Sequence, residues 1–204
     1  MHYFRKDYDV FAPDLKGFGD NKNMVKPYSL DDYIRDVEEY KYKYGIKNPH
    51  VIAHSFGARI AIKASAQNKE FCDKLVLTGA AGLKPKNTLL KMSKRALFKA
   101  LRKVVPKEKL KIFYSKDYLA VDEVMKKSFN LIVSEHLDDK IQNVKNPTLI
   151  IFGERDKQTP LYMAKRLFNG IPDSRLVVIE GAGHFCFIDK PAKFNTEVRE
   201  FLLS

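Results

Sequence analysis

The chain has 204 residues, of which 45% are apolar and 30% charged, and its formal net charge is +12. This composition excludes a disordered or collagen-like polymer, two cysteines are too few for a disulfide scaffold, and the length fits one compact domain with an inserted subdomain. Because no apolar run approaches the roughly 18 residues of a membrane span and the first residues lack the apolar stretch of a signal peptide, we expect a cytoplasmic protein without stable membrane insertion.

The predicted secondary structure alternates between short strands and longer helices. β-Branched runs bounded by turn residues predict strands at 8–12, 50–54, 74–78, 148–152 and 176–179. Amphipathic spacing, capping residues and stop signals predict helices at 30–44, 58–66, 88–105, 121–133, from 160 onwards and at 191–203. Strands that alternate with helices indicate βαβ units. The predicted fold class is therefore α/β, with a mostly parallel sheet of about five strands flanked by helices.

The basic charge is concentrated in one part of the chain. Between Leu83 and Asn146 there are 16 basic and 7 acidic residues, so this segment carries +9 of the net charge. A uniformly basic surface would suggest a nucleic-acid partner, whereas this concentration indicates an inserted element, and we expect no nucleic-acid partner. We expect a core of residues 1–82 and 147–204 with a helical cap inserted at 83–146. Its basic helix face is typical of a solvated surface, and weak attraction to anionic membranes or acidic substrates is the alternative.

The sequence around Ser55 predicts a sharp turn between a buried strand and a helix. The strand at 50–54 runs directly into Ser55, Phe56 and Gly57. Such a corner forces the serine backbone into a strained conformation, so Ala53 and Gly57 on either side must be small. The turn lifts the hydroxyl above the sheet, and the helix N-terminus adds positive potential where an oxyanion could form. A serine turn without chemistry is the alternative interpretation.

A serine hydroxyl needs a positioned base, and the sequence offers one base and two carboxylates that qualify. His184 lies in a glycine-flanked loop after the last predicted strand, while Glu154 and Asp156 follow the strand at 148–152. The carboxyl ends of parallel strands meet at one sheet edge, which is where open α/β sheets place their ligands. We expect Asp156 to orient His184, with Glu154 as the second choice.

Ser55, Asp156 and His184 occur in this order, each directly after a predicted parallel strand. This order resembles that of the α/β-hydrolase fold superfamily, and the resemblance covers nearly the whole chain. Within the superfamily the sequence is similar to the small branch of capped serine esterases and C–C hydrolases. Three further motifs match: the Phe-Ala-Pro-Asp-Leu-Lys-Gly-Phe-Gly loop at 11–19, Gly-Glu-Arg-Asp at 153–156 and Gly-His-Phe at 183–185.

The resemblance implies a serine hydrolase that acts on a small-molecule carboxylic ester or related carbonyl substrate, without a cofactor or metal. Ser55 would attack the carbonyl carbon, His184 would take its proton, and Asp156 would fix the imidazole tautomer. An acyl-enzyme would form and be hydrolysed, and the backbone N–H of Phe56 would be one oxyanion donor. A serine at this position argues against haloalkane dehalogenases and epoxide hydrolases, which carry aspartate there.

The sequence departs from the family pattern at two places. Ala53 stands where the family usually has glycine, and it is still small enough to fit. The family's sheet usually has eight strands, and the strand at 8–12 matches its fourth. The preceding strands, and the His-Gly motif that supplies a second oxyanion donor, have no match. Either the chain is a fragment of a longer protein, or the strand at 8–12 pairs directly with that at 50–54. The alternative function is therefore an impaired or inactive hydrolase-like protein that acts by binding.

The remaining histidines and cysteines are expected to be structural. His2, His50 and His136 lack the spacing of metal ligands, so no metal site is predicted. His54 is expected to pack beside the serine turn, and Cys186 is expected to fill the core as a small apolar residue.

Overall fold

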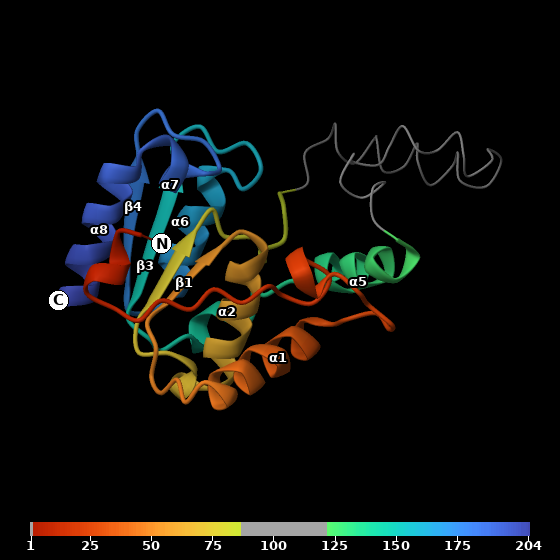
Figure 1. Cartoon of the computed structure of the whole chain (residues 1–204). Helices are drawn as coiled ribbons and strands as arrows, with labels where there is room; N and C mark the ends of the chain where they lie inside the picture. Colours follow the sequence, from red (N-terminus) through yellow and green to blue (C-terminus); the bar gives the residue numbers. More distant parts are fainter. Residues whose placement is uncertain (1, 87–121) are drawn as a thin grey trace.

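The computed structural model describes residues 2–86 and 122–204. Within these residues the chain forms an α/β fold on a parallel four-stranded sheet with the spatial order β1-β2-β3-β4 (Figure 1). The strands are β1 (Val51–His54), β2 (Leu75–Thr78), β3 (Thr148–Gly153) and β4 (Ser174–Ile179). Each overlaps a predicted strand, so the predicted fold class is confirmed.

The predicted strand at 8–12 is wrong, and the described sheet has four strands rather than about five. Residues 8–12 adopt no regular structure and do not pair with β1. Tyr8 and Val10 instead pack against the apolar cluster under α8 (Pro191–Leu203). Strand formation depends on tertiary context as well as on local sequence, and here Tyr8 and Val10 are partly buried beside α8 while the segment does not pair with β1. Within the described residues, the outer edge of β1 has no paired strand.

Helices connect the strands and cover both faces of the sheet. They are α1 (Leu30–Lys43), α2 (Phe56–Gln67), α5 (Glu123–Ser134), α6 (Leu161–Gly170), α7 (Cys186–Asp189) and α8. α1 begins with a capping box, in which Ser29 and Asp32 each bond the other's backbone N–H through the side chain. The helix predicted at 88–105 lies outside the described residues. No helix in the described part of the chain is long and apolar enough to cross a membrane.

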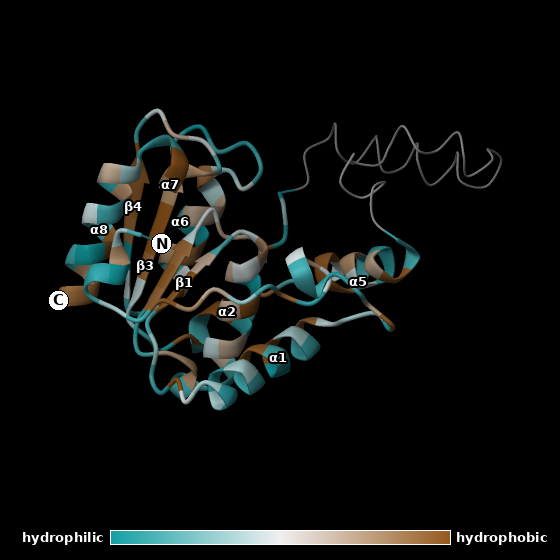
Figure 2. Ribbon diagram, viewed as in Figure 1, coloured by the Kyte–Doolittle hydropathy of each residue, from teal (hydrophilic) through white to brown (hydrophobic). Residues whose placement is uncertain are grey.

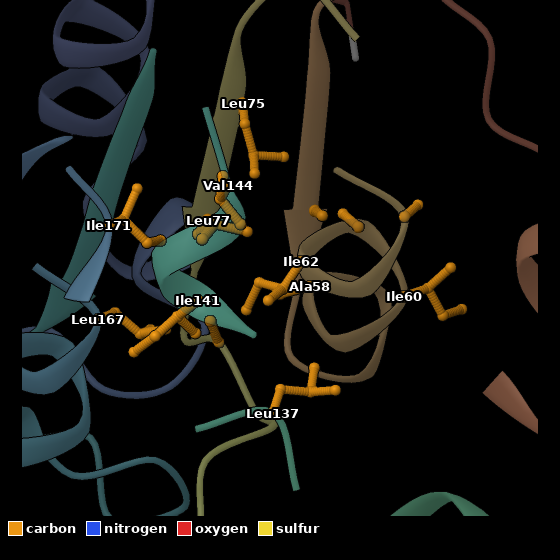
Figure 3. Close-up of a cluster of buried hydrophobic side chains, with 14 of the residues drawn as sticks. Ala58, Ile60, Ile62, Leu75, Leu77, Leu137, Ile141, Val144, Leu167 and Ile171 are labelled. Carbon is orange, nitrogen blue, oxygen red and sulfur yellow. The ribbon is translucent and has the colours of Figure 1, made fainter. Parts of the chain in front are cut away.

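Alternating side chains of the strands divide the core into two clusters, one on each face of the sheet. Leu75 and Leu77 belong to the cluster that α1, α2 and α6 cover, whereas Val76 belongs to the cluster under α8. Figure 2 shows the strands as apolar ribbons between helices of mixed polarity. Figure 3 shows Ile62 of α2 packed toward Leu77 and Ile141 in the first cluster. Burial on both faces is typical of a parallel sheet.

α5 joins the core through its buried side. The Tyr28 N–H donates to Ser128 Oγ of α5 at 2.8 Å. Leu137, fully buried just after the helix, donates its N–H to the Gly82 carbonyl at 3.0 Å. This bond ties the chain just after α5 to the loop after β2. The division of the chain into a core and a cap stays a prediction.

Candidate active site

Ser55 lies in the sharp turn between β1 and α2. Its backbone has φ 49° and ψ −106°, a conformation that a residue other than glycine rarely adopts. Two hydrogen bonds hold it there: the Ser55 N–H donates to the Thr78 carbonyl at 3.0 Å, and the Ala81 N–H donates to the Ser55 carbonyl at 3.2 Å. The serine side chain does not cap α2, so the helix leaves its hydroxyl available. A turn this strained persists because the surrounding structure, here the end of β2 and the loop after it, determines it.

The start of α2, next to Ser55, favours an anion. Phe56 is the first residue of the helix, so its N–H has no acceptor within the helix and lies where the helix dipole is positive. Ala53 is buried at 7% exposure, which agrees with the expected need for a small residue there. The same expectation for Gly57 is not supported by packing, because an added Cβ would meet no atom of the described residues within 4 Å.

Asp156 and His184 form a buried hydrogen-bonded pair. Asp156 Oδ2 lies 2.8 Å from His184 Nδ1, and the side chains are 0% and 6% exposed. The second carboxylate oxygen, Oδ1, accepts the backbone N–H groups of Gln158 at 2.8 Å and Thr159 at 2.9 Å. Burial alone would raise the pKa of Asp156, but the hydrogen bonds from His184 and Thr159 outweigh it and hold this pKa below its ordinary value. Asp156 is therefore an ionised acceptor that fixes the ring of His184.

Thr159 is a member of this group that the sequence analysis missed. Its Oγ1 donates to Asp156 Oδ2 at 2.7 Å and lies 3.3 Å from His184 Nδ1. The hydroxyl therefore occupies the remaining position on the oxygen that bonds the histidine. A local signal was present, because an aspartate often accepts bonds from residues two and three positions after it in a turn.

Glu154 does not contact His184 and has a different position. Its Oε2 accepts the Gly181 N–H at 2.9 Å, in the loop that leads to the histidine. The Arg155 N–H donates to the Ala182 carbonyl at 2.8 Å in the same loop. Of the two carboxylates that the sequence offered, Asp156 pairs with the imidazole and Glu154 braces its loop.

Ser55 and His184 lie at the same edge of the sheet. Ser55 follows β1, and Gly79 follows the neighbouring β2; an added Cβ at Gly79 would lie 3.0 Å from His184 Cε1. The ring centroids of His54 and His184 are 4.6 Å apart. In the described part of the chain, the His184 hydrogen bonds run through Nδ1 and no hydrogen bond of the Ser55 hydroxyl is found.

Among residues 2–86 and 122–204, no group of three or more His, Cys, Asp or Glu side chains could hold a metal ion. Cys186 is fully buried beside the Thr78 hydroxyl, and burial raises the pKa of its thiol, as suits a core residue.

Comparison of the sequence with protein families and curated proteins identifies relatives of this chain. The model of the alpha/beta hydrolase family matches residues 2–197. The chain is 27% identical over 222 residues to the AB hydrolase superfamily protein YisY of Bacillus subtilis, covering 97% of this chain and 82% of that protein. It is 26% identical over 223 residues to a 2-hydroxy-6-oxononadienedioate/2-hydroxy-6-oxononatrienedioate hydrolase from Pseudomonas, covering 96% of this chain and 77% of that protein.

Solved structures of other hydrolases align with this chain. A meta-cleavage product hydrolase from Pseudomonas fluorescens, CumD, aligns with a TM-score of 0.73 and 25% identity, covering 98% of this chain and 82% of that one. An esterase from Exiguobacterium antarcticum aligns with a TM-score of 0.72 at 22% identity, covering 94% of this chain and 80% of that one. The second likeness concerns the fold alone.

Proposed function

Because the chain belongs to the alpha/beta hydrolase family, and is a hydrolase, we propose that it uses Ser55, His184 and Asp156 to cleave a small carboxylic ester or related carbonyl substrate. The observation that carries this proposal is the buried 2.8 Å hydrogen bond between Asp156 and His184. That pair lies at the sheet edge where the turn at Ser55 is held in a strained conformation. A weak alcohol becomes a nucleophile when a base and its orienting carboxylate stand at the same edge.

The proposed reaction begins with proton transfer from Ser55 to His184. Since Asp156 is an ionised acceptor, the His184 Nδ1 carries a proton, and the lone pair of Nε2 is free to take the serine proton. Ser55 Oγ forms a bond to the carbonyl carbon, and the imidazolium then protonates the leaving group. Water, deprotonated by the same Nε2, hydrolyses the acyl-enzyme and regenerates Ser55. Asp156 stabilises the charged imidazole in both steps.

The negative charge on the carbonyl oxygen is placed at the start of α2 in this proposal. The N–H of Phe56 and the helix dipole both favour an anion there. The family's second donor has no match in the sequence, so Phe56 is the donor that this chain contributes. The similar Pseudomonas hydrolase is named for an oxo-dioate, which supports including carbonyl substrates other than esters.

We also propose that the segment at 83–146 forms a cap beside the sheet edge that carries Ser55 and His184, and that its basic charge attracts anions. The chain just after α5 bonds the loop after β2, through Leu137 and Gly82, and the segment carries most of the net charge. An acidic carbonyl substrate would be attracted by that charge, and the attraction would weaken as salt is added.

A fluorophosphonate probe tests the proposed function, since it reacts with an activated serine. We expect the probe to label the parent protein at Ser55 and the label to be lost in Ser55→Ala. Ser65→Ala is a matched control, because Ser65 is a buried serine on the same helix, and labelling should persist there. Absence of labelling in folded parent protein would contradict the proposal.

The alternative function, binding by an inactive hydrolase-like protein, is favoured by one observation. No strand of the described residues pairs with the outer edge of β1, next to the serine turn. Turnover of p-nitrophenyl acetate by the parent protein, lost in Ser55→Ala, would exclude this alternative.

A further inference from the structure

His54, the last residue of β1, shares a hydrogen-bond acceptor with Ser55. His54 Nδ1 lies 3.1 Å from the Thr78 carbonyl, and the Ser55 N–H donates to the same oxygen at 3.0 Å. A carbonyl oxygen only accepts, so His54 Nδ1 carries the proton in the neutral ring. The bond that fixes the imidazole of His54 and the bond that fixes the strained serine therefore meet at one atom of β2.

The ring of His54 forms one side of the environment of His184. The two ring centroids are 4.6 Å apart, and the rings are tilted by 53°. His54 also contacts the rings of Phe185 at 5.2 Å and Phe187 at 5.0 Å, and Phe185 lies 5.2 Å from His184 as well. Nε2 of His54 is buried in this aromatic group and has no hydrogen-bond partner within the described residues. The ring is therefore clamped between Thr78 and two phenylalanines, with His184 against it.

This environment keeps His54 uncharged. Burial lowers the pKa of His54, and a positive charge on His184 lowers it further, while the Thr78 carbonyl and Asp156 act in the opposite direction with a smaller effect. His184 becomes a cation in the proposed reaction, and a second cation at this distance would oppose it. A neutral aromatic neighbour does not.

We propose that His54 is a positioning residue: its ring, fixed by Thr78, packs against the imidazole of His184 and holds it in line with Asp156 and Ser55. The inference rests on the proposed function, because it concerns the orientation of the base in that reaction. His54 acts through His184 and has no proton to transfer itself, since its Nδ1 proton is used by Thr78.

Three variants separate the ring of His54 from its hydrogen bond. His54→Phe keeps a ring and loses the donor, His54→Asn keeps a donor near the Nδ1 position and loses the ring, and His54→Ala loses both. We expect His54→Ala and His54→Asn to lower kcat for p-nitrophenyl acetate roughly tenfold or more with little change in KM, since small displacements of a base are costly. His54→Phe should lose roughly threefold, the worth of one hydrogen bond.

The urea midpoint distinguishes positioning from a general loss of folding. Under conditions where each variant is fully folded, kcat should fall in His54→Ala and His54→Asn with KM nearly unchanged, and His54→Phe should restore most of the rate.

Two results would overturn the inference. One is an unchanged kcat in His54→Asn, which retains the hydrogen bond without the ring. The other is a loss of kcat in His54→Phe as large as that in His54→Asn, which would mean that a ring at this position does not hold His184. If His54→Ala fails to fold, the comparison of His54→Phe with His54→Asn still tests whether the ring positions His184. Fluorophosphonate labelling of the parent protein at Ser55 separates a failure of this inference from a failure of the proposed function. If the label is absent, the proposed function is overturned as well.

Discussion

Lys63 Nζ lies 2.7 Å from a carboxylate oxygen of Glu135 and 2.7 Å from one of Asp31, and its side chain is 6% exposed. Lys63 is on α2, Asp31 is on α1 and Glu135 ends α5. One turn earlier on α2, Arg59 donates to the Ile132 and Glu135 carbonyls at the C-terminal end of α5, where a cation offsets the helix dipole. The helix that begins at the serine turn thus carries the charges that hold α1 and α5.

Glu135→Gln should lower the free energy of unfolding by about 1–3 kcal/mol, less than the 3–5 typical of a buried charge left alone, because Asp31 still pairs with Lys63. Burial lowers the pKa of Lys63, but its bonds to Asp31 and Glu135 outweigh this and raise the pKa overall. Lys63 is therefore charged in the folded protein and forms an ion pair with both carboxylates. Urea denaturation measures the change. Glu123→Gln is the control, since Glu123 pairs with Lys126 at 82% exposure and should change stability by less than about 0.5 kcal/mol. Equal losses in the two variants would contradict the prediction.

Gly153→Ala should destabilise the fold and displace the His184 loop. An added Cβ at Gly153, the last residue of β3, would lie 2.1 Å from the Gly183 carbonyl and 2.4 Å from that of Ala182. Backbone cannot move aside as a flexible side chain can, so we expect a loss of roughly 1–3 kcal/mol, seen as a lower thermal midpoint. Gly57→Ala should not lower the midpoint, because its Cβ would meet nothing within 4 Å in the described residues. A midpoint for Gly153→Ala equal to that of the parent would be evidence against this contact.

Thr159→Val should lower kcat roughly tenfold, because a hydrogen bond to a charged group is worth about 1.5–3 kcal/mol and each 1.4 kcal/mol is a factor of ten. The hydroxyl bonds the Asp156 oxygen that also bonds His184, so its loss removes one of the bonds that hold this oxygen toward the imidazole. Thr159→Ser retains the donor and should restore most of the rate. Steady-state kinetics check this, and a serine variant as slow as the valine variant would show that the hydroxyl has no such role.

The stability of the protein should depend on pH through His54. Its pKa is lowered from 6.5 by burial and by the charge of His184. Below pH 6.5 the unfolded chain therefore takes up a proton that the folded chain does not, so the unfolding free energy falls as the pH falls toward the lowered value. His54→Phe removes this contribution. Urea denaturation at about pH 8 and about pH 5.5 should show the variant gaining stability relative to the parent on acidification. A difference that is constant with pH would refute it.

Ile52→Lys should reduce aggregation with little effect on stability. Ile52 lies on β1, whose outer edge has no paired strand within the described residues, and its side chain is 44% exposed. A charge on an open edge opposes pairing with another chain. Light scattering on heating measures the effect. Phe168→Lys removes a side chain of 43% exposure from a helix, and an equal benefit there would mean that the sheet edge is not responsible.

The local sequence determined the elements that rest on local interactions. The Ser29 cap and the turn at Ser55 were predictable because a side chain bonding a nearby N–H, or a strand running directly into a helix, involves residues close together in the chain. The location of the site at one edge of the sheet was also predictable, because the carboxyl ends of parallel strands lie at the same edge. The strand predicted at 8–12 failed for the opposite reason, because a strand needs a partner that the local sequence does not specify.

The tertiary structure decided which side chains share one environment. The sequence placed Glu154 and Asp156 in one loop with nothing physical to separate them, and the approach of His184 from a distant loop made Asp156 its partner. Thr159 and His54 gained their positions in the same way, through contacts with a residue more than twenty positions further along the chain. Spacing and pattern describe neighbours along the chain, whereas a hydrogen-bonded pair depends on distances that exist only once the sheet has formed.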